Sequence, residues 1–242
     1  MLNAFSPYST TSNNSPNGII PNNFAYPSTQ KNNFTIYYHN TSGIRTKSSS
    51  FQTRVPMHEF DIIALTETWL CDTILSSEYF DDFYNVFRYD RSRDATGFNM
   101  GGGVLLAVRQ DFNCKQINLH ISDNILEQLC ILVSFNSNKS IYFIISHIPP
   151  NSPIELYDMH LKNINYISEN CTDSQEICVL GDYNLCNIIW SFEDKILLPF
   201  NIKSDLESMV IGYFLSNELQ QINYCKNDIG RILDLIFIVK FV

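Results

Sequence analysis

The stretch that decides the fold is an apolar run ending in one carboxylate, Asp61-Ile62-Ile63-Ala64-Leu65-Thr66-Glu67-Thr68-Trp69-Leu70. Residues 61–66 are short, apolar and partly β-branched, which predicts a strand buried on both faces of a sheet. Glu67 follows at the C-terminal end of this strand, where open α/β sheets place their functional groups. The stretch therefore predicts an α/β protein whose chemistry involves Glu67.

A second stretch repeats this design much later in the chain, Cys178-Val179-Leu180-Gly181-Asp182-Tyr183-Asn184. Asp182 and Asn184 alternate, so they share one face if the strand is regular. Two such strand ends can converge on one divalent cation and one phosphate, which predicts metal-dependent phosphodiester chemistry. The alternative is an Asx turn, because Gly-Asp-x-Asn is also typical of turns.

Length and charge limit the classes of protein. The 242 residues allow one sizeable domain, or one domain with a tail, and 45% of them are hydrophobic. The net charge of −9 excludes a whole-protein attraction to nucleic acid but not a local basic strip. The start does not resemble a signal peptide, and no apolar run is long enough to suggest a membrane span. We therefore expect an intracellular protein, nuclear or cytoplasmic, that is not secreted and has no membrane partner.

Seven cysteines are scattered along the chain without CxxC spacing, at positions 71, 114, 130, 171, 178, 186 and 225. Their odd number and spacing favour reduced, mostly buried thiols over disulfides or a zinc site.

The chain divides into an expected tail and one expected domain. Residues 1–32 are rich in Asn, Ser, Thr and Pro and have no periodicity, which predicts a disordered tail. In the domain, 33–242, we expect strands at 34–40, 61–66, 84–89, 104–108, 128–135, 140–147, 177–181 and 233–238. Helices are expected at 153–168 and 205–217, whereas Pro56 predicts a short or broken helix in 51–59, and the stretch after 181 reads as irregular. Many strands and few helices favour a two-layer sheet sandwich flanked by helices.

Six segments in order carry a resemblance to a known family. They are residues 38–47, 61–70, 101–108, 149–150, 181–184 and 232–236. The chain resembles the endonuclease domain of LINE-type non-LTR retrotransposons, within the endonuclease/exonuclease/phosphatase (DNase I-like) superfamily, over about residues 34–240. The resemblance implies a four-layer α/β/β/α sandwich that nicks DNA. It also implies Mg²⁺ (or Mn²⁺) without a small-molecule cofactor, and a partner reverse transcriptase that this chain does not contain.

The resemblance also implies roles for four polar residues. Glu67 and Asn40 would hold the metal, which fits the preference of Mg²⁺ for hard oxygen ligands. Asp182 would position the attacking water, and Asn184 would donate to the phosphate. Each has a structural alternative: Glu67 can cap a strand end beside a surface cation, and Asn40 can be a turn residue.

Two departures from the family pattern set expectations about activity. His147 stands before the Pro-Pro pair where the family usually has Tyr; it can still donate to phosphate, or be structural. Asp234 matches the family Asp that pairs with a C-terminal His, but no histidine follows His160. We therefore expect a C-terminally truncated domain missing its last strand, with reduced or absent turnover.

Basic residues in two loops are expected to contact the DNA backbone. The first loop carries Arg45 and Lys47, and the second carries Arg88, Arg91 and Arg93. The alternative for both groups is solvation, with Asp90 and Asp94 partly neutralising the second. Residues 101–103 are three glycines, which predict a turn with positive φ.

Three hypotheses follow for the function. The first is a Mg²⁺-dependent DNA endonuclease, and the second is a catalytically silent remnant that binds DNA or a protein. The third, a phosphatase or sphingomyelinase of the same superfamily, fits the segments less well. Turnover on DNA separates the first from the second, and a substrate test separates the third.

Overall fold

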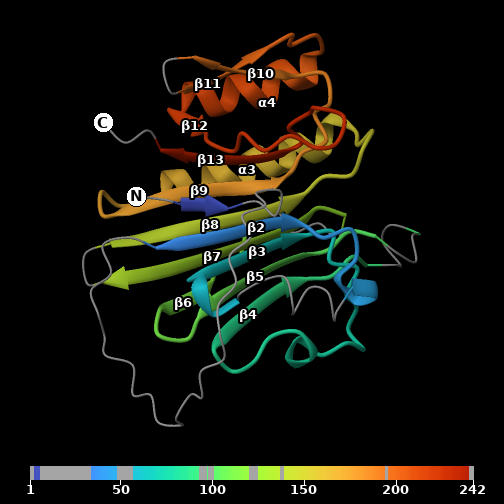
Figure 1. Cartoon of the computed structure of the whole chain (residues 1–242). Helices are drawn as coiled ribbons and strands as arrows, with labels where there is room; N and C mark the ends of the chain where they lie inside the picture. The colour runs from blue at the N-terminus through green and yellow to red at the C-terminus, as the bar shows by residue number, and fades with distance from the viewer. Residues whose placement is uncertain are drawn as a thin grey trace, which may run out of the picture.

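Two β-sheets stacked face to face form the centre of the molecule (Figure 1). A computed structural model describes residues 3–5, 34–47, 57–92, 97, 101–119, 125–136, 139–193 and 196–239. Within these residues no helix is long and apolar enough to cross a membrane. All seven cysteines lie in the described part and are free, but only Cys130 and Cys178 are buried, so the expectation of mostly buried thiols is wrong.

The first sheet has five strands in the order β1-β2-β3-β5-β4. Their bounds are β1 Asn3–Phe5, β2 Thr35–Asn40, β3 Ile62–Thr66, β4 Tyr84–Tyr89 and β5 Val104–Arg109. Because β2 and β3 are parallel, their C-terminal ends meet at the same edge of the sheet. The decisive stretch therefore occupies the central strand, as the sequence predicts.

The second sheet has six strands in the order β12-β13-β9-β8-β7-β6. Their bounds are β6 Asn113–Gln116, β7 Glu127–Asn136, β8 Lys139–His147, β9 Gln175–Asp182, β12 Leu219–Gln221 and β13 Asp234–Val239. Strands β8 and β9 are parallel, with helix α3, Ile154–Glu169, as their crossover. Helix α4, Asp205–Ser216, is capped at its N-terminus by Ser204, whose side chain accepts from the Glu207 N–H.

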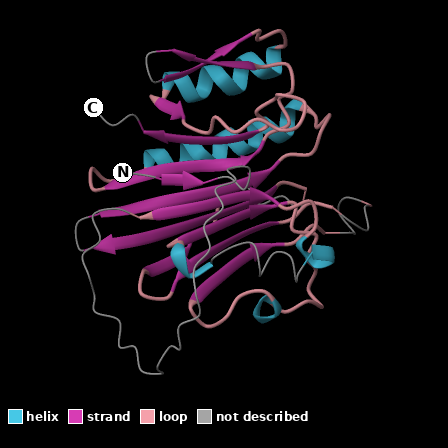
Figure 2. Ribbon diagram, viewed as in Figure 1, coloured by secondary structure: helices cyan, strands magenta, loops and turns pink. Residues whose placement is uncertain are grey.

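Alternating side chains divide the core into three layers. Ile62 and Ala64 of β3 face the second sheet, whereas Ile63 and Leu65 face outward. The outer face of the second sheet is covered by α3 and α4 (Figure 2). The outer face of the first sheet is covered by loops and three short 3-10 turns, η1 Ile44–Lys47, η2 Met57–Glu59 and η3 Ser76–Glu78. The expected mixed α/β layered fold is confirmed. In the layer outside the first sheet, the helical structure among the described residues consists of 3-10 turns.

Several expectations need correction. The stretch after 181 was expected to be irregular, but it contains an antiparallel hairpin of β10, Ile189–Glu193, and β11, Ile196–Phe200. Three residues of the expected tail, Asn3–Phe5, pair with β2, because an edge strand offers unpaired backbone groups whatever the side chains. The rest of 1–33 lies outside the described residues, as does 51–56 of the expected broken helix.

A buried histidine makes stability depend on pH. His160 of α3 has no exposed surface, and its ring nitrogens contact Gln128, Ser146 and Tyr183. Burial lowers its pKa to about 3, from an ordinary value of 6.5. Only the unfolded chain therefore binds this proton between pH 6.5 and 3, so stability falls as the pH falls below 6.5.

We expect this proton to cost about 2 kcal/mol of unfolding free energy at pH 5, relative to pH 7.5. Urea denaturation of the wild type and of His160→Gln at both pH values measures it. Asp182 and Asp234 work in the opposite direction but are common to both proteins. A wild-type-minus-variant difference that does not change with pH would contradict the assignment.

Candidate active site

Four ionisable side chains form one row across the second sheet. The strand register pairs Glu127 with His147, His147 with Asp182, and Asp182 with Asp234. This row lies at the C-terminal ends of β8 and β9. Asn40 and Glu67 approach it from the C-terminal ends of β2 and β3 in the first sheet.

Glu67 is held at the junction of the two sheets. It has a φ of 53°, which turns the chain sharply after β3. Its Oε2 accepts from Trp69 Nε1 at 2.6 Å and from the Gly102 N–H at 2.9 Å. Its Oε1 lies 2.5 Å from His147 Nε2. Burial opposes ionisation, but His147 and the two N–H donors outweigh it and lower the pKa of Glu67 to about 2.

His147 lies between two carboxylates. Its Nδ1 is 2.7 Å from Glu127 Oε2, opposite the contact with Glu67, and its side chain is only 1% exposed. Burial alone would lower its pKa, but Glu127 and Glu67 together raise the pKa to about 9. We therefore expect His147 to be an imidazolium at neutral pH, with Nδ1 bonded to Glu127 and Nε2 forming an ion pair with Glu67.

Glu127 is a residue of this candidate site that sequence reasoning missed. Its buried carboxylate accepts from the Gly103 N–H at 2.7 Å and forms an ion pair with Arg91. The available signal was a lone Glu at the start of an apolar strand, where burial requires a partner. Arg91 is thus part of the site rather than a solvated loop residue.

The glycine turn exists because this ion pair lies against the backbone. Gly102 has a φ of 67°, and an added Cβ would meet Arg91 and Glu127 side-chain atoms. We expect Gly102→Ala to lower the free energy of unfolding by about 2–4 kcal/mol, through backbone strain and displacement of the pair. Chemical denaturation measures the loss.

Gly230→Ala is the matched control, because Gly230 has a φ of 79° but open space around an added Cβ. It should lose only the strain component, about 1 kcal/mol. Equal losses in both variants would show that the ion pair does not constrain the turn.

Asp182 receives donors from both sheets. Asn40 Nδ2 donates to its Oδ2 at 2.8 Å across the sandwich, and the Asn184 N–H donates to its Oδ1 at 3.3 Å. The second contact is the Asx-turn geometry that the sequence left as an alternative. Asn184 Nδ2 donates to the Ile148 carbonyl at 3.0 Å, so one donor of this amide holds the end of β8.

Asp234 is paired with a tyrosine. Tyr38 Oη donates to its Oδ1 at 2.7 Å, where the resemblance implies an imidazole. Burial raises the pKa of both Asp182 and Asp234, and their mutual repulsion raises that of Asp182 further. The two carboxyl groups therefore titrate as a pair.

The donor set fits a hard divalent cation. Ligand atoms of Glu67, His147 and Asp182 lie within 4.8 Å of one another. The side-chain oxygen of Asn40 accepts from the Ser42 N–H at 3.2 Å, whereas the carboxylates of Glu67 and Asp182 suit Mg²⁺, which often takes only one or two carboxylates. His147 does not suit it while protonated, and its contact with Glu67 competes with a cation for the same oxygen.

The basic residues expected to contact DNA differ in their exposure. Arg45 is exposed on η1, whereas the side chain of Lys47, and Arg93 altogether, lie outside the described part. Arg88 donates to the Cys71 and Ile74 carbonyls and to Asp90, and its side chain is 16% exposed. Arg88 of β4 thus holds the loop that contains Cys71 and Ile74 through hydrogen bonds to its backbone, and we assign Arg88 no DNA contact.

Solved structures share this fold at low sequence identity. The endonuclease domain of TRAS1, a telomere-specific non-LTR retrotransposon, matches with a TM-score of 0.57 and 14% identity over 85% of this chain and 84% of that one. An AP endonuclease from Archaeoglobus fulgidus matches at 0.56 and 14%, over 84% and 86%. TDP2 from D. rerio, complexed with a single-strand DNA product, matches at 0.54 and 15%, over 84% and 82%. No protein-family model and no curated protein matches the sequence.

These matches define the class of fold. The chain has the layered fold of the endonuclease/exonuclease/phosphatase proteins, which the sequence resemblance implied. Its structural neighbours are nucleases and phosphatases of this fold, a retrotransposon endonuclease among them.

Proposed function

We propose that this chain is a Mg²⁺-dependent DNA endonuclease (nickase) domain of the non-LTR retrotransposon type. The supporting observation is the convergence of Glu67 and Asp182 from different sheets, together with the hydrogen bond that Asn40 of the first sheet donates to Asp182. Neutralising and orienting a phosphodiester requires oxygen ligands for a cation beside a group that orients water. In this proposal Glu67 and Asn40 hold Mg²⁺, with Mn²⁺ as a substitute.

The remaining residues have roles that follow from their charges. A bound divalent ion would stabilise negative charge on the phosphate and polarise its oxygens. Asp182 accepts a proton from the attacking water and orients it. Asp234, which lies opposite Asp182 in the strand register, raises the basicity of that carboxylate. His147 carries a positive charge and supplies electrostatic stabilisation near the phosphate.

The proposed substrate is DNA. One structural neighbour was solved with a single-strand DNA product, which supports this choice. Arg45, which is exposed, and Lys47 and Arg93 remain proposed backbone contacts. Arg91 contributes through Glu127 rather than by direct contact.

A second candidate function is a silent DNA- or protein-binding module. Two observations favour it: the imidazolium of His147 competes for Glu67, and Tyr38 rather than a histidine donates to Asp234. A site that lacks its metal ligand, or whose residues are wrongly oriented, would bind DNA without cutting it.

Two labelled substrates test the reaction class. The first is a duplex oligonucleotide with an internal label, and the second is an oligonucleotide with a 3′-phosphate. We expect Mg²⁺-dependent cutting inside the duplex that leaves an end extendable by a DNA polymerase. Release of inorganic phosphate from the second substrate, with an intact duplex, would support the phosphatase reading instead.

A further inference from the structure

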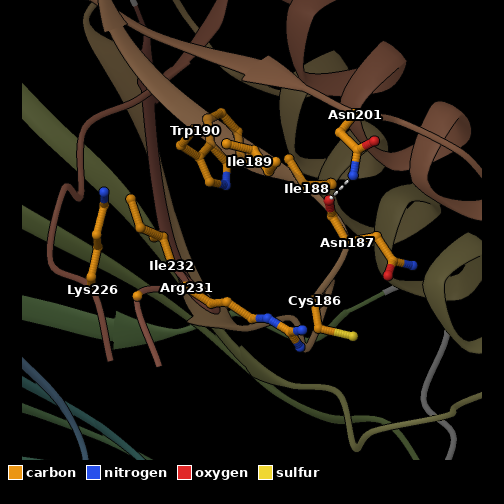
Figure 3. A pocket seen from close by; sticks show the side chains of 10 residues that line it. Cys186, Asn187, Ile188, Ile189, Trp190, Asn201, Lys226, Arg231 and Ile232 are labelled. Carbon is orange, nitrogen blue, oxygen red and sulfur yellow. Dashed lines mark hydrogen bonds between the residues drawn. The ribbon is translucent and has the colours of Figure 1, made fainter. Parts of the chain in front are cut away.

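A cavity of about 230 Å³ lies between the β10–β11 hairpin and the loop before β13 (Figure 3). Trp190 and Asn187 line it from the hairpin side, and Lys226 and Arg231 line it from the loop side. It contains none of the residues assigned above to the active site. No carboxylate is among its lining residues, although the whole chain is acidic.

Trp190 presents an unused donor to this cavity. Its side chain is buried, with 8% of the residue exposed, and packs edge-on against Phe237. Its Nε1 is buried and has no hydrogen-bond partner in the described part of the chain. Figure 3 shows the indole nitrogen turned toward the cavity. A buried N–H without an acceptor costs free energy, and an acceptor inside the cavity would remove that cost.

Two cations add to this donor. Lys226 and Arg231 are exposed, and neither forms an ion pair with another described residue. A lysine ammonium and an arginine guanidinium both bind phosphate oxygens, the second in a bidentate way. One indole N–H with two cations and no carboxylate therefore suits a phosphate group.

The cavity adjoins the proposed active site along the chain. Cys186, at its rim, follows Asn184 by two residues, and Arg231 precedes Asp234 by three. The Tyr183 N–H donates to the Leu233 carbonyl at 3.1 Å, which ties these two segments together. Three residues span at most about 10 Å when fully extended, so Arg231 lies close enough to Asp234 for one bound strand to reach both.

We propose that this cavity binds a backbone phosphate of the DNA strand beside the bond that is cut. Trp190 Nε1, Lys226 and Arg231 are its donors, and Asn187 lines the same wall. The identity of the strand rests on the proposed function, but the phosphate chemistry of the cavity does not.

The two tryptophans of the chain provide separate reporters. Trp69 Nε1 donates to Glu67, whereas Trp190 Nε1 faces the cavity. Nitrogen-15 NMR therefore shows two indole N–H signals, which Trp190→Phe assigns. We expect a single-stranded oligonucleotide and inorganic phosphate each to shift the Trp190 signal, and Mg²⁺ alone to shift the Trp69 signal.

Variants measure the contribution of each donor to oligonucleotide affinity, without metal. Trp190→Phe keeps the ring and removes the N–H, and we expect about tenfold weaker binding with an unchanged salt dependence. The double variant Lys226→Gln/Arg231→Gln should reduce the slope of log affinity against log salt by about 1.4. Lys162→Gln is the matched control, because Lys162 pairs with Asp158 on the exposed face of α3.

The outcomes separate this inference from the proposed function. A Trp190 signal that ignores both ligands overturns the inference, as does full affinity in both variants. A shift with inorganic phosphate but not with the oligonucleotide overturns the DNA source and assigns the cavity to a free phosphate compound. A Trp190 shift with DNA, together with no cutting and no effect of Mg²⁺ on Trp69, upholds the inference and refutes the proposed endonuclease.

Discussion

Glu67→Gln is expected to reduce Mg²⁺-dependent nicking of DNA about a thousandfold or more. The substitution removes the carboxylate charge where the two sheets meet, and losing a metal ligand costs several kcal/mol of transition-state stabilisation. The amide oxygen can still accept from Trp69 and Gly102, and His147 keeps Glu127 as its partner. The variant should therefore fold while losing both Mg²⁺ affinity and activity.

Single-turnover nicking and the Mg²⁺ dependence of Trp69 fluorescence measure these two losses together. Glu155→Gln is the control, since Glu155 is exposed in the first turn of α3 and is not one of the residues assigned to the site. Nicking by Glu67→Gln at the wild-type rate would remove Glu67 from the metal site. Unchanged Mg²⁺ binding with lost nicking would move its role from ligand to orientation.

Asp182→Asn is expected to slow nicking by a hundred- to ten-thousandfold, the usual contribution of a general base. Asn keeps the shape of Asp182 but cannot take the proton of the attacking water. The Mg²⁺ concentration for half-maximal activity should change much less than in Glu67→Gln. Initial rates at saturating Mg²⁺, measured with the same plasmid, give the comparison.

Stability provides the control for this variant. Burial raises the pKa of Asp182, so its charge costs free energy in the folded state above that pKa. The Asn side chain removes this cost, but it has only one oxygen. One of the two donors, Asn40 Nδ2 or the Asn184 N–H, therefore loses its acceptor. We expect an unfolding free energy within about 1 kcal/mol of the wild type at pH 8. A variant that is equally stable and still cuts at the wild-type rate would refute the role of Asp182.

The sequence predicts much of the fold because its strands follow simple periodic rules. The runs around Glu67 and Asp182 occupy β3 and β9, and the helical spacing of 153–168 becomes α3. The hairpin β10–β11 escapes prediction because its exposed Phe192 and Phe200 break the alternation of buried and exposed positions. Strand β1 escapes because the sequence around Asn3–Phe5 has no periodic pattern that predicts a strand.

The site is only partly predictable for a different reason. Their positions at strand ends make three polar residues predictable from the sequence: Glu67, Asn40 and Asp182. The structure brings these three side chains together. Their catalytic and metal-binding roles remain proposals. Glu127 pairs with His147 of the neighbouring strand, and Tyr38 contacts Asp234 across the two stacked sheets. No local sequence pattern reveals either contact. The imidazolium state of His147 likewise follows from two neighbours on different strands.

Nicking of supercoiled plasmid by the wild-type chain, with Mg²⁺ and with EDTA, is the most direct test of the proposed active site. The convergence of Glu67, Asn40 and Asp182 predicts nicked circles that accumulate only with Mg²⁺ and disappear in Glu67→Gln. A folded wild-type chain that binds the plasmid but leaves it supercoiled at every Mg²⁺ concentration would contradict the endonuclease proposal. That result would instead identify the chain as a silent DNA-binding module.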